Sequence, residues 1–216
     1  MKRATVLALL LATGTAWPGA ATAAQEPAAK SAPPAPGVST DPTQVRPGRY
    51  LLDPDHAKIT WSISHLGFST YYGAFSDVSG EASLDPKDPA KSTLSVRIGT
   101  GSVGTLNAQL DEHLKKPEFL DVETFPEARF VARAVEPTGP TTARVIGDLT
   151  LKGVTKPVSF DATFNQAGAH PVDKKYTVGF DGRAVIKRSD FGVSAYLPVL
   201  GDEIALRLEG EFKAAE

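Results

Sequence analysis

Alternating apolar and polar positions run through the chain between Tyr50 and Phe212 and predict β-strands. Ile59, Trp61 and Ile63, for example, fall on one face, with polar residues between them. The clear alternations cover residues 59–65, 94–98, 145–151, 158–164 and 204–212, and weaker ones cover 72–84, 128–135 and 176–187. Proline- and glycine-containing turn signals separate them. The pattern therefore predicts about eight strands.

One stretch has a helical period instead. Leu106, Leu110 and Leu114 recur at helical spacing, and Asn107 is a suitable N-cap. Basic residues follow, just before a proline. We expect one short helix from Asn107 to Lys115, covering a mouth or an edge of the sheet.

Two architectures fit about eight strands with one apolar face, namely a sandwich and a closed barrel. The sheet should be antiparallel because no helices alternate with the strands. The inward-facing stripes mix large aromatic residues with alanine and glycine. Such a mixture suits a long apolar cavity and equally suits a filled core, so periodicity leaves both open.

The N-terminal sequence predicts a signal peptide for export over residues 1–23. Lys2 and Arg3 precede an apolar stretch, and Ala21-Thr22-Ala23 has the small-x-small form of a cleavage site. An uncleaved anchor helix is the alternative. Cleavage predicts a periplasmic protein, or a secreted one in a cell without an outer membrane, with no membrane span left.

A linker is expected next. Six of the 23 residues from Gln25 to Pro47 are proline, and alanine and small polar residues fill most of the rest. Such a composition buries too little apolar surface to offset its ordering entropy. We therefore expect a disordered Pro/Ala-rich linker over residues 24–47 and a folded domain over residues 48–216.

Composition removes several classes of function. The 23 Lys+Arg and 25 Asp+Glu give a net charge of −2, and no basic run appears, so nucleic-acid binding lacks its electrostatic footprint. The absence of cysteine excludes disulfides, thiol catalysis and thiolate metal sites.

The sequence offers few candidates for catalytic or metal-binding residues. His56, His65 and His113 do not have metal-ligand spacing, so no metal site is expected. The segment from Arg188 to Gly192 follows a strand and has two interpretations. It is a turn, with Gly192 supplying positive φ, or it places Arg188 at a mouth to bind a carboxylate or phosphate.

Several short motifs occur together in a fixed order. Their residues are Tyr50-Leu51-Leu52-Asp53-Pro54-Asp55-His56, His65-Leu66-Gly67-Phe68-Ser69, Asp111-Glu112-His113-Leu114, Gly147-Asp148-Leu149-Thr150-Leu151-Lys152-Gly153 and Arg188-Ser189-Asp190-Phe191-Gly192. Together they resemble the YceI-like family of bacterial periplasmic lipid-binding proteins, from about Gly48 to Lys213.

The resemblance implies an all-β fold, an antiparallel eight-stranded lipocalin-like barrel with one short helix. It also implies non-catalytic binding and transport of a polyisoprenoid or similar amphipathic lipid, such as an isoprenoid quinone, without a cofactor. The residues expected to line the lipid tail are Trp61, Ile63, Phe75, Phe119, Phe130, Leu149, Phe160 and Phe180. Those expected at the head-group mouth are His65, Asn107, His113 and Arg188.

Two other functional classes stay open. An enzyme acting on a lipid or small hydrophobic substrate would depend on His65, His113 or Asp111. A passive secreted interaction domain would have a filled barrel. The sequence also leaves open whether the chain forms a homodimer.

Overall fold

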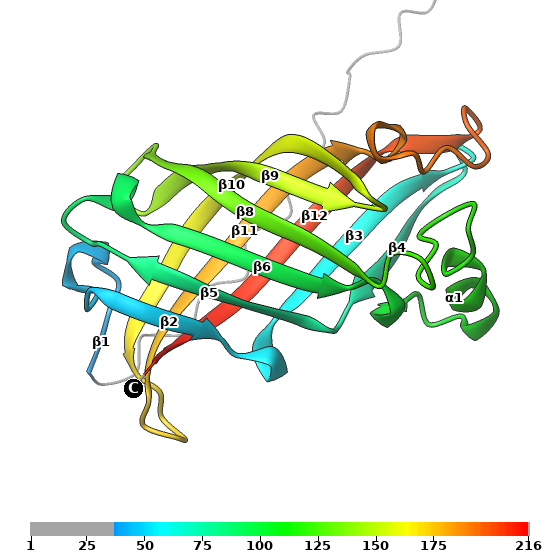
Figure 1. Ribbon diagram of the computed structural model, residues 1–216. Coiled ribbons are helices and arrows are strands. Elements are labelled where there is room, and N and C mark those ends of the chain that lie inside the picture. The colour runs from blue at the N-terminus through cyan, green and yellow to red at the C-terminus, as the bar shows by residue number, and fades with distance from the viewer. Residues whose placement is uncertain (1–36, 216) are drawn as a thin grey trace, which may run out of the picture. The chain divides into compact units, whose positions relative to one another are not determined.

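Antiparallel strands close into a barrel in the computed structural model, which describes residues 37–215 (Figure 1). The strands are β1 (Val38–Ser39), β2 (Gly48–Leu52), β3 (Lys58–His65), β4 (Ser69–Phe75), β5 (Val78–Leu84), β6 (Thr93–Gly99), β7 (Val103–Gly104), β8 (Glu127–Pro137), β9 (Thr142–Leu151), β10 (Val154–Ala169), β11 (Tyr176–Lys187) and β12 (Leu200–Ala214). The expected all-β barrel is confirmed, and the sandwich is excluded.

The ring closes through β12, which pairs with β11 on one side and with both β2 and β3 on the other. Phe212 pairs with Leu52 of β2, and Leu206 pairs with Trp61 of β3. The 3₁₀ turn η2 (Pro54–His56) separates β2 from β3. β2 and β3 therefore occupy one strand position of the barrel, interrupted by η2. β5 and β4 pair with them and occupy the next strand position in the same interrupted way.

The alternating stripes point as expected. Leu206, Leu208 and Gly210 of β12 line the interior, whereas Ala205 and Arg207 between them are exposed. A cluster of buried core residues lies at the end of the barrel away from α1, where Tyr50 and Val178 are 1% and 0% exposed. We call this the far end and the α1 end the mouth end.

The hairpin between β9 and β10 shows how a short motif fixes register. Its two-residue turn is Lys152–Gly153, with φ values of 49° and 74°. Positive φ at both positions defines the type I′ turn that matches strand twist. The Lys-Gly pair therefore sets the register that faces Leu149 inward.

Residues 37–215 contain one α-helix, α1 (Ala108–Leu114), which lies beside one end of the barrel (Figure 1). Asn107 is its N-cap, and the side chain accepts from the N–H groups of Gln109 and Leu110 at 3.1 and 3.2 Å. The expected helix and its cap are confirmed. The Asp111 carboxylate accepts from the Thr105 backbone N–H and hydroxyl, which ties α1 to the loop before it.

The expected linker boundary needs a correction. Residues 37–47 belong to the fold, because β1 pairs with β10 and Val45 is only 7% exposed within the core. Asp41 caps the turn η1 (Pro42–Gln44), whose proline suits the first turn of a helix. The proline content of residues 37–47 suggested a linker, but in the structure Pro42 begins a 3₁₀ turn. The expected signal segment at residues 1–23 and the first part of the expected linker lie outside the described residues.

Candidate functional site

Three apolar cavities follow one another along the barrel interior. The largest, about 470 Å³, lies at the mouth end under α1. It shares Leu206 with a central cavity of about 140 Å³. The central cavity shares Phe180 and Phe212 with a far cavity of about 240 Å³. The interior is therefore hollow along its length, as the cavity interpretation of the aromatic–small mixture expected.

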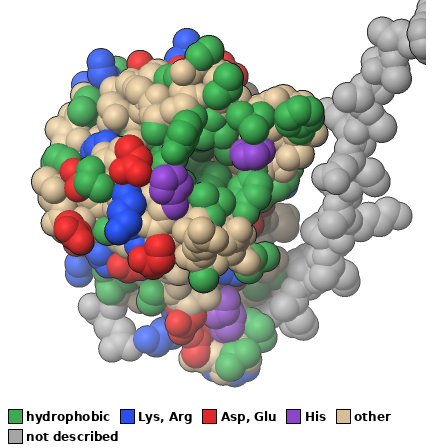
Figure 2. All heavy atoms as spheres, turned by 90° about the vertical axis from the view of Figure 1, so that its right-hand side faces the viewer, with side chains coloured by type: hydrophobic (Ala, Val, Ile, Leu, Met, Phe, Trp, Pro, Cys, Tyr) green, Lys and Arg blue, Asp and Glu red, His purple; other side chains and the backbone are tan. Residues whose placement is uncertain are grey.

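The mouth cavity opens at the end of the molecule that Figure 2 faces. Hydrophobic side chains surround a hollow there, with histidine beside it. Most of its rim comes from three loop regions: the β3–β4 hairpin, α1 with the loop after it, and the loop between η5 (Arg188–Phe191) and β12. Barrel strands, including β11 and β12, form the deeper walls. The site is thus assembled where loops gather on a rigid barrel.

The residues expected to line a lipid tail divide between two cavities. Those in the mouth cavity are Trp61, Ile63, Phe75 and Phe119, and those in the central cavity are Phe130, Leu149, Phe160 and Phe180. The structure brings all eight to the interior. Their contact with a lipid stays a prediction.

Trp61 has a further property. Its indole Nε1 is buried and has no hydrogen-bond partner among the described residues. The ring packs against Gly73, where a Cβ would collide with it. A buried N–H without an acceptor is unfavourable. A ligand oxygen that reached the Trp61 Nε1–H would accept a hydrogen bond from it.

His65 and His113 line the mouth cavity, as expected. The His113 ring packs edge-on against Phe119, with centroids 5.0 Å apart, and its Nδ1 lies 3.7 Å from a carboxylate oxygen of Glu118. His65 lies beside Tyr71, with centroids 6.0 Å apart. The two histidines provide polar groups at the edge of an otherwise apolar space.

Asn107 does not belong with them. Its side-chain oxygen already accepts the two N–H bonds that cap α1, and the residue lies outside the mouth-cavity lining. The mouth assignment failed because the same short polar side chain suits a cap and a ligand contact. Asn107 therefore positions α1.

Arg188 lines the mouth cavity but directs its guanidinium into the loop. It is 5% exposed and donates to the carbonyl oxygens of Gly201, Val193, Ala195 and Leu200 at 2.7–3.1 Å. Burial lowers the pKa of Arg188 from its usual value. Four of its five N–H groups are used, so the geometry favours a structural role over the expected anion contact.

The turn interpretation of this segment holds in a modified form. Gly192 has φ of 73° and ends η5, as expected. The carboxylate that accepts from the Ser189 N–H and Oγ comes from β12, where Asp202 lies at 2.9 and 2.8 Å from them. These bonds from Ser189 hold the pKa of Asp202 below its ordinary value.

Sequence reasoning missed several residues of the mouth cavity. Tyr196 and Val199 lie in a loop without strand or helix periodicity, and Leu66 lies in a hairpin turn. Periodicity finds residues on regular elements only. Composition was the remaining signal for these residues. Large apolar residues are unusual in a turn, so their presence there could have indicated a binding site.

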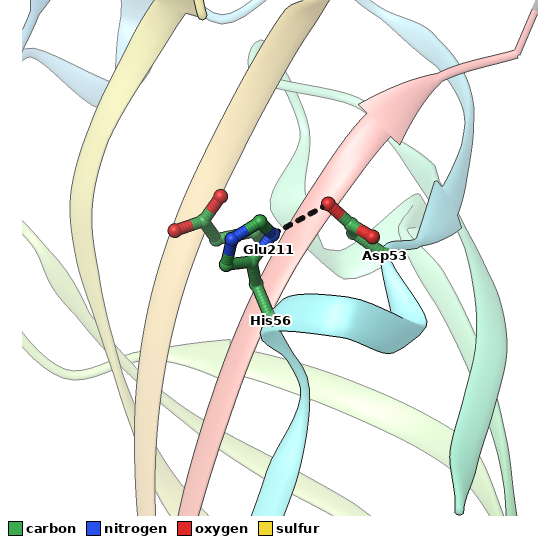
Figure 3. A group of neighbouring side chains, drawn as sticks. All are labelled: Asp53, His56 and Glu211. Carbon is green, nitrogen blue, oxygen red and sulfur yellow. Dashed lines mark hydrogen bonds and ion pairs between the residues drawn. The ribbon is translucent and has the colours of Figure 1, made fainter. Parts of the chain in front are cut away.

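A polar cluster lies at the far end (Figure 3). The His56 Nδ1 and the Lys213 Nζ contact the same oxygen of Asp53, at 2.8 and 2.7 Å, and Glu211 lies beside them. Burial would raise the pKa of Asp53, but the hydrogen bonds from Lys213 and His56 outweigh it and hold the value at about 2. The bond to Asp53 is also the main reason that the pKa of His56 is raised.

This cluster offers ligand atoms from Asp53, His56 and Glu211 that lie within 4.8 Å of one another. Lys213 already supplies a cation there, and its second bond, at 2.7 Å, is to Asp173. The arrangement therefore acts as an ion-pair clasp joining η2 and β12 to the β10–β11 loop.

The histidines do not assemble as a catalytic set in the described residues. His56 lies at the far end, whereas His65 and His113 lie at the mouth. Asp111 directs its carboxylate to Thr105. Neither His65 nor His113 therefore has a hydrogen-bonded carboxylate within residues 37–215 that would orient it as a general base.

A model of the YceI-like domain family matches residues 50–212. The chain belongs to the YceI-like family. Relatives of this YceI-like chain include UPF0312 proteins of Pseudomonas putida and Pseudomonas savastanoi pv. phaseolicola. Each is 43% identical over 152 residues, which cover 69% of this chain and 79% of the relative.

Several solved structures share the barrel. BcnA of Burkholderia cenocepacia aligns with a TM-score of 0.67 at 26% identity, covering 76% of this chain and 99% of BcnA. The Campylobacter jejuni YCEI protein gives 0.63 at 32% identity, covering 69% and 88%. A polyisoprenoid binding domain of Saccharophagus degradans, implicated in plant cell wall breakdown, gives 0.61 at 14% identity, covering 79% and 100%. At that identity the last comparison shows the fold alone.

Neither α1 nor any 3₁₀ turn between residues 37 and 215 has the length and apolar character of a membrane-spanning helix.

Proposed function

We propose that this protein binds a polyisoprenoid or similar amphipathic lipid, an isoprenoid quinone included, and carries it through the periplasm without altering it. The observation that carries the proposal is the run of three apolar cavities inside one closed barrel, in which neighbouring cavities share the wall residues Leu206 and Phe180. A long, thin apolar chain is the ligand shape that fits such a run.

The energetics favour a lipid with a small polar head. An apolar tail has no hydrogen-bonding groups, so its affinity comes from surface removed from water, about 0.8 kcal/mol per buried CH₂. A polar head is costly to bury unpaired. His65, His113 and Trp61 line the mouth cavity, where the polar head would lie while the tail extends inward.

Two comparisons support this proposal. The chain is a member of the YceI-like family, and the Saccharophagus domain that shares its barrel is described as polyisoprenoid-binding. An enzymatic role is less well supported, because Asp111 is engaged with Thr105. A passive interaction domain would have filled the barrel.

The deciding experiment is native mass spectrometry on the exported protein, purified from its own cells without detergent. A discrete added mass, released by organic solvent and identified as a prenyl lipid, is the expected result. A protein that stays bare after incubation with prenols and quinones would rule out the proposal.

A pair of variants controls the location of the lipid. Leu206 points inward between the mouth and central cavities, whereas its neighbour Ala205 is exposed. Leu206→Trp should abolish or shorten the retained lipid, and Ala205→Trp should leave it unchanged. Equal retention by both variants would place the lipid outside the barrel.

A further inference from the structure

Four of the exposed apolar side chains at the mouth end lie in two loops. Leu66 and Phe68, in the β3–β4 turn, are 46% and 89% exposed, and Tyr196 and Val199, in the loop before β12, are 59% and 61% exposed. We call these four residues the apolar rim. Single exposed apolar side chains are ordinary, but several gathered at one opening can mark an interaction surface.

The rim is continuous with the ligand space. Leu66, Tyr196 and Val199 line the mouth cavity as well as facing solvent. Figure 2 shows hydrophobic side chains running from the outer surface into the hollow at this end. An apolar chain entering over the rim would therefore contact apolar side chains from the surface to the cavity.

The rim is also held in place. Leu66 and Tyr196 both have left-handed backbone conformations, with φ of 55° and 60°. Non-glycine residues persist there only where the surroundings impose it. Arg188 supplies that restraint for one of the two loops through its bonds to Val193, Ala195 and Leu200.

The two ends of the barrel differ in chemistry. The far end carries the clasp of Asp53, Lys213 and Asp173, whose ion pairs favour water. None of the four rim residues is charged. The apolar rim is thus free of charge, although its end of the barrel also carries charged side chains such as the Glu112–Lys115 ion pair at α1.

We propose that the apolar rim docks on the surface of a lipid bilayer, with Phe68 and Tyr196 inserted at the interface and the mouth cavity facing the hydrocarbon. This rests on the proposed function, because a tail of the kind proposed is stored in bilayers. Crossing water would expose that tail at about 0.8 kcal/mol per CH₂, and a docked rim removes that step. Tyrosine at the interface places its ring in the apolar layer and its hydroxyl in the head groups.

Flotation of the exported protein with phosphatidylcholine vesicles tests the docking. The wild type should float with the vesicles, and high salt should not release it, because the contact is apolar and screening does not weaken it. Phe68→Asp and Tyr196→Asp should each lower vesicle binding at least tenfold. Val172, 83% exposed in the far β10–β11 loop, is the matched control, and Val172→Asp should bind like wild type.

The outcomes separate docking from lipid binding. Phe68 is outside the lining of the mouth cavity, so Phe68→Asp should still take up a prenol from detergent solution while losing uptake from vesicles. Failure of wild type to take up prenol from detergent would reject the proposed function. Normal uptake from detergent with no vesicle binding, or equal binding by Phe68→Asp and Val172→Asp, would reject the docking alone. A dimer that Phe68→Asp dissociates, without vesicle binding, would assign the rim to a second copy and also reject it.

Discussion

The ring of Phe180 meets the ring of Phe212 edge to face, with centroids 6.0 Å apart, and both side chains form part of the walls of the central and far cavities. Phe164 adds a second edge contact to Phe180 at 5.8 Å. This aromatic group separates the central cavity from the far cavity.

Replacing the central ring should therefore lengthen the accepted tail. Phe180→Leu opens the central cavity toward the far one, at a stability loss of about 1 kcal/mol. Each further CH₂ admitted adds up to about 0.8 kcal/mol, roughly a fourfold change in Kd. Affinities for a series of prenols measure the shift. The exposed Val185 of the same strand gives the control Val185→Ala, and identical length profiles for the two variants would refute the partition.

Trp61 should distinguish ligands with an oxygen from plain hydrocarbons. Trp61→Phe keeps an aromatic ring and removes the unpartnered Nε1–H. We expect affinity for a prenol or quinone to fall roughly fivefold, the value of about 1 kcal/mol for one hydrogen bond. Affinity for squalene should stay the same. Equal losses for prenol and squalene would mean that the indole N–H does not contact the head.

Arg188 should matter for stability beyond its charge. Arg188→Lys keeps the charge but cannot reach four carbonyl oxygens, so we expect unfolding free energy to fall by at least about 2 kcal/mol. Arg144→Lys, in an exposed pair with Asp161, should change it by less than about 1 kcal/mol. Chemical denaturation measures both. Similar losses would show that the guanidinium bonds contribute little.

The far-end clasp should weaken in acid. Because the folded pKa of Asp53, about 2, lies below its ordinary 3.8, Asp53 stabilises the fold above about pH 4, and this contribution is lost as pH falls toward 2. At neutral pH the contribution is about 2 kcal/mol. Thermal unfolding from pH 2 to pH 7 should show a shallower acid slope in Asp53→Asn than in wild type. The exposed Asp161→Asn should keep the wild-type slope.

The barrel followed from the sequence because strand period and motif order agree. Inward stripes such as Leu206, Leu208 and Gly210 need only alternation to be found. The helix was equally local, since Asn107 caps the turn that follows it directly. The eight interior residues were found for the same reason, as they lie on the predicted apolar stripes or, for Phe119, next to the helix.

The parts that sequence reasoning missed depend on distant partners. Arg188 is defined by the carbonyl groups of a loop whose path no periodicity describes. Residues 37–47 fold because β10 offers an edge and the core has room for Val45. Asp53 and Lys213 are 160 positions apart, and only the closed ring brings them together. Such contacts are properties of the assembled barrel.

The position of β12 also bears on the order of folding. It is the C-terminal strand of the described fold, yet it joins the early strands β2 and β3 to β11. Residues 200–214 must therefore be synthesised before the ring can close, and pairs such as Leu52 with Phe212 close a very long loop. Until then, the nascent sheet keeps two open edges, and its apolar interior has no far wall. Completion of the barrel is consequently a late, all-at-once event that creates the cavity in the same step.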